Sequence, residues 1–270
     1  MKFAPWLVLW LALASCGVGG LRHRYDDNRQ VRALQEASIA RYGERPIAGQ
    51  SIDGFFKDKV GLIAVDGGTF PVGRAVPISA DGYYLTAWHV VADAKFGLKE
   101  TTVNGKRIRV DEYPGKIVWH DAVADLAIVK FGFRPLNFFE AQAAPLEKGE
   151  AVFSGATGRN SGTLLTQRNS TGTYNLSESL KTATGNGSFR TAGKVTSAGA
   201  LDEQPSRIIY QSTLIGRRGM SGGPVVNRTG HLVGIITGMQ AKVFSSTKTS
   251  FSMIDAKALN AIVQADRSER

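Results

Sequence analysis

Short runs rich in valine, isoleucine and aromatic residues alternate with glycine, Asp-Gly and proline from Val60 onward. Examples are VGLIAVDG, GRAVPISADGYYLTAWHVV and DLAIVKFG, with no helical segment interleaved between them. The Asp-Gly step inside the second of these runs is typical of a hairpin turn. The pattern therefore predicts an antiparallel β-barrel or sandwich.

The runs fall into two sets, one before and one after Pro145. The second set includes EAVFSGAT, RIIYQSTL and PVVNRTGHLVGIITG. Two sets predict two barrels, a first over residues 59–143 and a second over residues 144–255. The stretch 161–190 is rich in Ser, Thr, Asn and Gly, which indicates a loop or a long hairpin.

Apolar residues at helical spacing flank this β-rich region on both sides. Residues 31–42 predict a short helix on the outside of the body, and residues 256–270 predict a C-terminal helix docked on the second barrel. The positions at this spacing are Val31, Leu34, Ile39 and Tyr42 in the first segment and Ala256, Leu259, Ile262 and Val263 in the second.

The first sixteen residues, MKFAPWLVLWLALASC, place one lysine before an apolar run that ends in small residues and Cys16. The run is shorter than the roughly 20 apolar residues that span a bilayer, and its length is that of a secretory signal. Its end, LASC, resembles the lipobox of bacterial lipoproteins, which implies cleavage before Cys16 and acylation of that residue. We expect a lipoprotein signal peptide over 1–15, then a tether and the N-terminal helix over 16–58. By this resemblance, Gly17 favours the periplasmic face of the outer membrane over the inner membrane; the alternative is an ordinary signal peptide with an incidental cysteine.

Composition narrows the function classes. The net charge is +10, and such a balance can indicate nucleic acid, an anionic membrane or acidic polymers as partners. No run of Lys and Arg reaches the length of a binding patch, so we expect a solvated basic surface and no nucleic-acid partner. The single cysteine excludes a disulfide within the chain. None of the four histidines are spaced as a metal pair, so we expect no metal and no cofactor.

Three residues of catalytic type occur where predicted strands begin or end. His89 follows a strand in LTAWHVV, Asp125 opens one in ADLAIVK, and Ser221 lies in the glycine-rich GMSGGPVV. A serine hydroxyl needs a base, an imidazole titrates near neutrality, and a buried carboxylate holds its tautomer. The order His, Asp, Ser is one of those that build a catalytic triad. Asp121 is a rival for the acid, but Asp125 opens the strand.

The glycines around Ser221 have a chemical use. Acyl transfer passes through a tetrahedral intermediate whose oxyanion needs donors, typically two backbone N–H groups. Gly219 can turn its N–H toward the same point as the N–H of Ser221 because it has no Cβ. We therefore expect Gly219 and Ser221 to form an oxyanion hole.

Taken together, TAWHVV, DLAIVK, GKVTSAG, GMSGGPVVN and GHLVGIITG resemble the landmarks of chymotrypsin-fold (trypsin-like) serine proteases, in the family's order. The style is closest to the disulfide-free bacterial Deg/HtrA-type proteases, without the PDZ domain that follows in most of them. The resemblance covers roughly Val60 to Ile254. It implies an all-β fold of two antiparallel six-stranded β-barrels and the activity of a serine endopeptidase.

The resemblance also locates a specificity pocket. It implies that Ile215 lies at the floor of this pocket and that Thr237 and Gly238 form the wall strand that pairs with substrate, with Met239 at the border. No acidic residue occurs among them, so we expect a preference for small or medium apolar side chains before the cut. In trypsin an aspartate precedes the nucleophile and pairs with a freshly cut N-terminus. Here the residue is Met220, so we expect its packing to set the loop and no activation by N-terminal clipping.

Three hypotheses follow for the function. The first is a membrane-tethered serine endopeptidase of the cell envelope, with protein or peptide substrates and an esterase as its variant. The second is an inactive or ligand-activated protease fold that serves as a binding or chaperone-like lipoprotein. The third is an envelope-surface protein that holds acidic polymers by its charge. The oligomeric state stays open.

Overall fold

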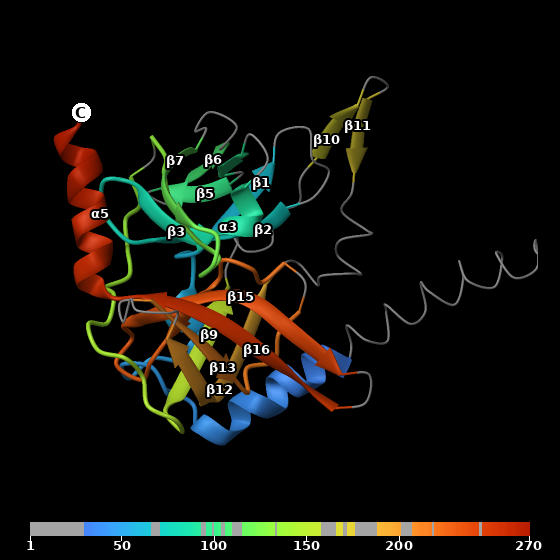
Figure 1. The fold of residues 1–270 in the computed structure, drawn as a ribbon. Helices are drawn as coiled ribbons and strands as arrows, with labels where there is room; N and C mark the ends of the chain where they lie inside the picture. The colour runs from blue at the N-terminus through green and yellow to red at the C-terminus, as the bar shows by residue number, and fades with distance from the viewer. Residues whose placement is uncertain are drawn as a thin grey trace, which may run out of the picture.

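Two β-sheet units follow one another along the chain and make up most of the computed structural model (Figure 1). The structure describes residues 30–65, 71–92, 96–98, 100–103, 106–109, 115–132, 134–157, 166–169, 172–175, 188–200, 207–217, 219–242 and 245–270. The predicted signal peptide, Cys16 and most of the predicted tether lie outside the described residues. Among the described helices, none is both long and apolar enough to cross a bilayer.

The first unit is a six-stranded antiparallel sheet in the order β4-β1-β2-β3-β8-β7. Its turn between β2 and β3 contains Gly82 at φ 95°, a left-handed conformation that favours glycine, as the Asp-Gly signal predicts. The strands are β1 (Gly61–Val65), β2 (Pro71–Pro77), β3 (Tyr83–Ala87), β4 (Phe96–Leu98), β7 (Lys116–Asp121) and β8 (Leu126–Lys130), beside a separate hairpin of β5 (Glu100–Val103) and β6 (Lys106–Arg109).

The second unit is a closed barrel in the order β12-β13-β16-β15-β14-β9. Its strands are β9 (Ala151–Ala156), β12 (Phe189–Ala200), β13 (Arg207–Ser212), β14 (Pro224–Val226), β15 (Leu232–Lys242) and β16 (Ser245–Ile254). A two-stranded hairpin, β10 (Thr166–Asn169) and β11 (Gly172–Asn175), lies in the segment where a loop or hairpin is expected.

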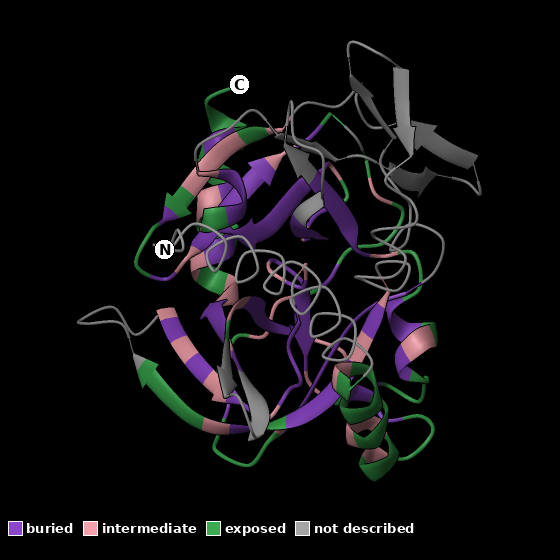
Figure 2. Ribbon diagram, turned by 90° about the vertical axis from the view of Figure 1, so that its right-hand side faces the viewer, coloured by how far each residue is buried: buried purple, intermediate pink, exposed green. Residues whose placement is uncertain are grey.

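The predicted all-β fold of two six-stranded antiparallel units is confirmed. The second unit closes, whereas in the described residues β4 and β7 are the two ends of the first sheet. Strands β3 and β8 of the first unit and β9 and β14 of the second are buried along most of their length, whereas β7 is largely exposed or half-buried. Figure 2 shows buried residues along strands of both units. The largest fully buried side chains, which define the two cores, include Tyr83, Leu85 and Ile128 in the first unit and Phe153, Tyr210 and Phe251 in the second.

A helix over residues 30–39, here called the N-terminal helix, continues into η1 (Ala40–Tyr42) and lies along the second barrel (Figure 1). The predicted helix is present, but its expected apolar face is wrong at Leu34, which is 45% exposed. The buried residue in its place is Gln35, at 3% exposure. Helix α2 (Ile52–Phe56) follows, capped by the Ser51 side chain.

The C-terminal helix α5 (Ala256–Ser268) begins at Asp255, whose carboxylate accepts the N–H of Ala258 at 2.8 Å. Leu259 and Val263 are buried, as the spacing predicts. The prediction that α5 docks on the second barrel is wrong, because it packs on β7 and its polar side chains bind the first sheet.

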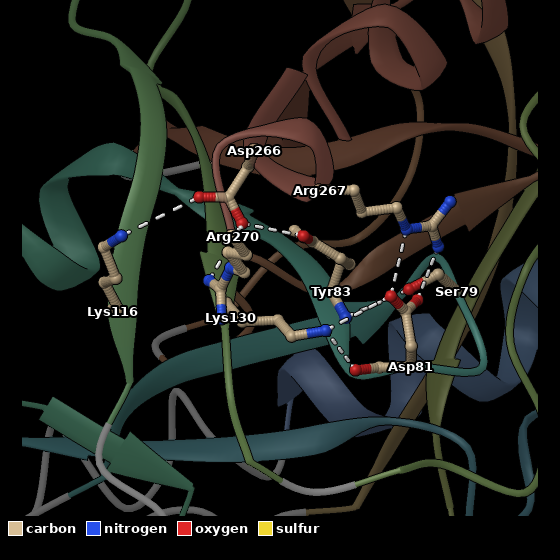
Figure 3. A network of polar contacts seen from close by, with 8 residues as sticks. All are labelled: Ser79, Asp81, Tyr83, Lys116, Lys130, Asp266, Arg267 and Arg270. Atoms are coloured by element: carbon tan, nitrogen blue, oxygen red, sulfur yellow. Dashed lines mark hydrogen bonds and ion pairs between the residues drawn. The ribbon is translucent and has the colours of Figure 1, made fainter. Parts of the chain in front are cut away.

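Polar contacts fix α5 to the first sheet (Figure 3). Tyr83 donates its hydroxyl to Asp266 at 2.7 Å, and Arg267 makes a two-point contact with Asp81 at 2.6 and 3.0 Å. Hydrogen bonds from Arg267 hold the pKa of the Asp81 carboxyl well below its usual range. Burial, followed by the hydrogen bond to Asp266, raises the pKa of Tyr83 to about 12. Lys116, Lys130 and Arg270 complete the network.

Candidate active site

The pairing of β3 with β8 brings His89 and Asp125 together. The register matches Ala87 with Leu126, so the residues that leave these two strands at the same end are neighbours. Trp88 N–H donates to the Asp125 carbonyl at 3.0 Å, which continues the ladder by one step. The chain then turns into the short helix α3 (Trp88–Val91), which carries His89.

Asp125 holds His89 at two points. One carboxylate oxygen, Oδ2, lies 2.6 Å from His89 Nδ1, and the other, Oδ1, accepts the His89 backbone N–H at 2.8 Å. The hydrogen bond from Asp125 raises the pKa of His89 above its ordinary value, against an opposing effect of burial. The imidazole is half exposed, so its free edge can meet a reactant. Asp125 itself has φ 53°, a left-handed conformation that short polar side chains tolerate.

Asp121, the rival for the acid, is used elsewhere. Its Oδ1 accepts the N–H groups of Val123 and Ala124 at 2.9 and 3.0 Å, which builds the turn before Asp125. Its Oδ2 is paired with Arg207 of β13, so it links the two sheet units. The carboxylate that reaches His89 is therefore that of Asp125.

Ser221 lies in the turn that leads into β14, and this turn requires glycine after the serine. Gly222 has φ 76°, and a Cβ placed on it would lie 2.1 Å from the Arg74 carbonyl oxygen. Its N–H donates to the Ile236 carbonyl of β15 at 2.7 Å. Arg74 of β2 donates its own N–H to the Ser221 carbonyl at 2.8 Å. The half-buried serine is thus fixed between the two units.

Gly73 places the serine turn beside the helix of His89. A Cβ on Gly73 would lie 2.6 Å from the side chain of Val90 and 2.8 Å from the Ser221 carbonyl oxygen. Val90 of helix α3, the residue after His89, and the Ser221 backbone therefore flank the same glycine of β2. Within the described residues no hydrogen bond joins Ser221 Oγ to His89, a contact that is often long before substrate binds.

The two expected oxyanion donors are free of protein acceptors within the described part of the chain, since neither the Gly219 nor the Ser221 N–H makes a bond. Gly219 has φ 83°, and a Cβ on it would meet nothing within 4 Å, so its conformation rather than space favours glycine. Arg74 Nε donates to the Gly219 carbonyl at 3.3 Å and holds that peptide from the side. Burial lowers the pKa of Arg74 to about 9.

Met220 is 1% exposed, as the expectation that its packing sets the loop requires. Its Sδ accepts the Arg217 N–H at 3.2 Å, and Gln35 Nε2 of the N-terminal helix lies 3.7 Å away. Sequence reasoning missed Gln35, which is a polar residue at an ordinary helical position. Only the tertiary fold reveals that it faces this loop.

The residues expected around the specificity pocket lie on adjacent segments. Ile215 is 6% exposed, while Met239 on β15 is 40% exposed and pairs in register with Thr249 of β16. A Cβ on Gly216 would lie 2.6 Å from Thr249 Oγ1 and 3.1 Å from Met239 Cβ. Met239 and Thr249 therefore crowd the chain next to Ile215, and sequence reasoning missed Thr249.

The wall-strand residues Thr237 and Gly238 lie at a bulge, where the β15–β16 register shifts between Ile236 and Gly238. On the other side of β15, pairing with β14 involves Leu232, Gly234 and Ile235, so in the described residues the strand edge beyond has no partner strand. An open edge of this kind can accept an extended peptide.

No group of three or more His, Cys, Asp or Glu residues suited to a metal ion occurs in the described ranges.

Comparison with known proteins gave matches to a protein family and to solved structures. A family model described as a trypsin-like peptidase domain matches residues 73–235, which include His89, Asp125 and Ser221. A search of curated proteins gave no significant match.

Solved structures share the fold. The MamO protease domain from Magnetospirillum magneticum is 19% identical, with a TM-score of 0.51 over 77% of this chain and 96% of that one. The HtrA-type protease AlgW with a tripeptide is 22% identical, with a TM-score of 0.53 over 77% of this chain. This chain covers 60% of that AlgW chain. An inactive form of Rv3671c from M. tuberculosis is 17% identical, with a TM-score of 0.50 over 79% of this chain and 89% of that one. At these identities the likeness establishes the fold.

Proposed function

Because the chain belongs to the trypsin-like peptidase domain family, we propose that it is a serine endopeptidase that hydrolyses peptide bonds through His89, Asp125 and Ser221. The observation that carries the proposal is the two-point contact between Asp125 and His89, at 2.6 and 2.8 Å, beside the turn of Ser221. The carboxylate holds Nδ1, and the half-exposed imidazole leaves its second edge open to a reactant.

In the proposed reaction, Ser221 Oγ attacks the peptide carbonyl carbon while His89 Nε2 takes the hydroxyl proton. Asp125 keeps the proton of the neutral imidazole on Nδ1 and stabilises the imidazolium that forms. The Gly219 and Ser221 N–H groups donate to the carbonyl oxygen as it gains charge. The imidazolium then gives its proton to the leaving amine, and the same steps with water release the acyl group.

We propose that the pocket takes small apolar side chains before the cut. Thr249 Oγ1 and Met239 Cβ crowd the Gly216 position, which supports a pocket too shallow for a large ring. Thr237 and Gly238, on the open edge of β15, pair with the substrate backbone. Protein or peptide segments in extended conformation are the substrate class.

We also propose that the chain is lipid-anchored in the cell envelope through Cys16, on the strength of the LASC motif alone. Growth with a palmitate analogue should label the parent chain and leave the Cys16→Ser variant unlabelled. Labelling of that variant would refute the assignment of Cys16.

The experiment for the catalytic proposal is fluorophosphonate labelling of the purified full chain. Ser221→Ala and His89→Ala variants serve as matched controls. We expect labelling of the parent and none of either variant, and cleavage of a peptide library should then follow small apolar residues. A folded parent that does not label would refute the endopeptidase and favour a protease fold that acts by binding.

A further inference from the structure

The N-terminal helix presents one buried side chain to the body, and it is an amide. Gln35 Nε2 donates to the carbonyl of Ile215 at 2.8 Å and lies 3.7 Å from Met220 Sδ. The segment that leads to Ser221 is here called the nucleophile loop (residues 215–221). Ile215, its first residue, and Met220, the residue before the serine, are both buried. A single side chain from 180 positions earlier in the sequence thus contacts both ends of this loop.

Other hydrogen bonds of the loop use its backbone N–H groups. The N–H of Ile215 donates to Thr191 Oγ1 of β12 at 2.9 Å, and the N–H of Arg217 donates to Met220 Sδ at 3.2 Å. The Ile215 carbonyl, in contrast, is satisfied by Gln35. A buried carbonyl without a donor is costly, so without Gln35 the loop would gain by moving to find one.

The helix itself is held by other residues. Glu36 makes a two-point ion pair with Arg190 of β12, at 2.7 and 3.1 Å. Ser38 Oγ accepts the N–H of Ala192, in the same strand, at 3.1 Å. Since these contacts place the helix without Gln35, replacing that residue alters the loop while the helix stays docked.

We propose that Gln35 is a positioning residue for catalysis: its amide fixes the nucleophile loop in the conformation that presents the Gly219 N–H and the Ser221 hydroxyl. The inference rests on the proposed function, because it concerns how Ser221 is made reactive. It goes beyond that function in assigning a role to a helix outside both sheet units and outside the matched family region, residues 73–235.

The side-chain chemistry of glutamine is specific to this place. Its NH₂ group can donate to the Ile215 carbonyl and approach the Met220 thioether, a weak acceptor, at the same time. Ionised glutamate has the same shape but offers only acceptors, which would face another acceptor. Leucine fills a similar volume and donates nothing.

The test uses the full chain with Gln35→Leu and Gln35→Glu, and with Leu34→Ala as a matched control on the exposed side of the same helix. Fluorophosphonate labelling is measured over a range of probe concentrations at pH 7.5, which separates the maximal labelling rate from the concentration of half-saturation. Thermal unfolding verifies that each variant is folded. Amide hydrogen exchange of the nucleophile loop is measured in parallel.

We expect both Gln35 variants to lower the maximal labelling rate about tenfold, as the loss of one buried hydrogen bond at the reacting loop implies, with the parent rate in Leu34→Ala. Exchange should rise in the nucleophile loop and not in β12. Folded Gln35 variants with parent labelling and parent exchange would overturn the inference. So would failure of both variants to fold, since Gln35 would then serve the fold as a whole.

The exchange measurement separates this inference from the proposed function. If the parent chain does not label, the endopeptidase proposal fails, and any role of Gln35 in catalysis fails with it. Faster exchange confined to the nucleophile loop in the Gln35 variants would still establish that Gln35 holds the loop. If the parent labels and the variants match it, only the positioning role is lost.

Discussion

Exchanging each of two neighbouring carboxylates for an amide should separate catalysis from stability. Asp125→Asn must lose one of two bonds, because both oxygens of Asp125 accept hydrogen bonds, from His89 Nδ1 and from the His89 backbone N–H. If the amide oxygen keeps the backbone contact, its NH₂ group faces Nδ1 and drives the imidazole proton to Nε2. That tautomer cannot take a proton from Ser221.

The expected loss is large for this reason. Amide substitution of the triad carboxylate lowers the rate by about 10⁴ where the geometry is otherwise kept, which corresponds to about 5 kcal/mol of activation free energy. The stability of the fold should change little, because Asp125 is partly exposed. Fluorophosphonate labelling of Asp125→Asn, normalised to folded protein, should therefore fall by three to four orders of magnitude, roughly.

Asp121→Asn should show the reverse. The amide oxygen can still accept the N–H groups of Val123 and Ala124, but the charge opposite Arg207 is lost. The Asp121 side chain is 7% exposed and that of Arg207 is 22% exposed, so the cost lies near the lower end for breaking a buried pair, about 3 kcal/mol. Urea unfolding should record this loss, while labelling per folded molecule stays near the parent rate. If Asp125→Asn labels at the parent rate, and Asp121→Asn is stable but does not label, Asp121 is the acid of the triad and the assignment is reversed.

Three further outcomes follow from individual contacts. The labelling rate should rise with pH through a midpoint above 6.5, because the Asp125 hydrogen bond raises the pKa of His89 and only the neutral imidazole is a base. Above this midpoint the rate should stay level to pH 8.5. A midpoint below 6.5 would contradict the raised pKa of His89. Tyr83→Phe should lower the free energy of unfolding by about 2 kcal/mol, the range for a hydrogen bond to a carboxylate. The pKa of Tyr83 is about 12 in the folded chain and 10.0 ordinarily, so this difference between parent and variant should be full below pH 10 and vanish toward pH 12. Urea unfolding at a series of pH values measures it. Met239→Ala should widen the specificity pocket and raise the ratio of cleavage after Leu or Phe to cleavage after Ala by about tenfold or more. If this ratio is unchanged in a peptide library, Met239 is not a wall of the pocket.

The parts of the site that sequence predicts well are those made by local pattern. Short apolar runs bounded by turn residues predict the strands β3 and β8. Antiparallel pairing then brings the residues that follow one strand close to the residue before the other. The chemistry of His89 and Asp125 and the glycines beside Ser221 could thus be read from short motifs. The glycines beside the serine are required by the backbone conformation and by close packing, as at Gly222, where any Cβ would meet the Arg74 carbonyl.

The parts that sequence could not predict depend on contacts between distant segments. Helical spacing favours Leu34 as the inward residue of the N-terminal helix, yet Gln35 is buried because the surface it meets offers a carbonyl rather than an apolar groove. Helical spacing predicts the apolar face of α5, but it does not predict that α5 docks on the first sheet. Asp266 and Arg267 look like solvent-facing charges until Tyr83 and Asp81 are placed opposite them.

The contacts that hold the nucleophile loop should keep its conformation unchanged between neutral pH and pH 8.5. A loop ordered by an N-terminal amine and an aspartate would loosen as the amine loses its proton, at a pKa near 8. Here the contacts behind the loop are an amide, a thioether and a carbonyl, from Gln35, Met220 and Ile215, and none of these titrates. Arg74, on the other side of the loop, carries a guanidinium, which stays charged in proteins over this pH range. The level rate expected between the His89 midpoint and pH 8.5 is therefore a property of the neutral contacts. A decline centred near pH 8 would mean that an ionised group outside this set holds the loop.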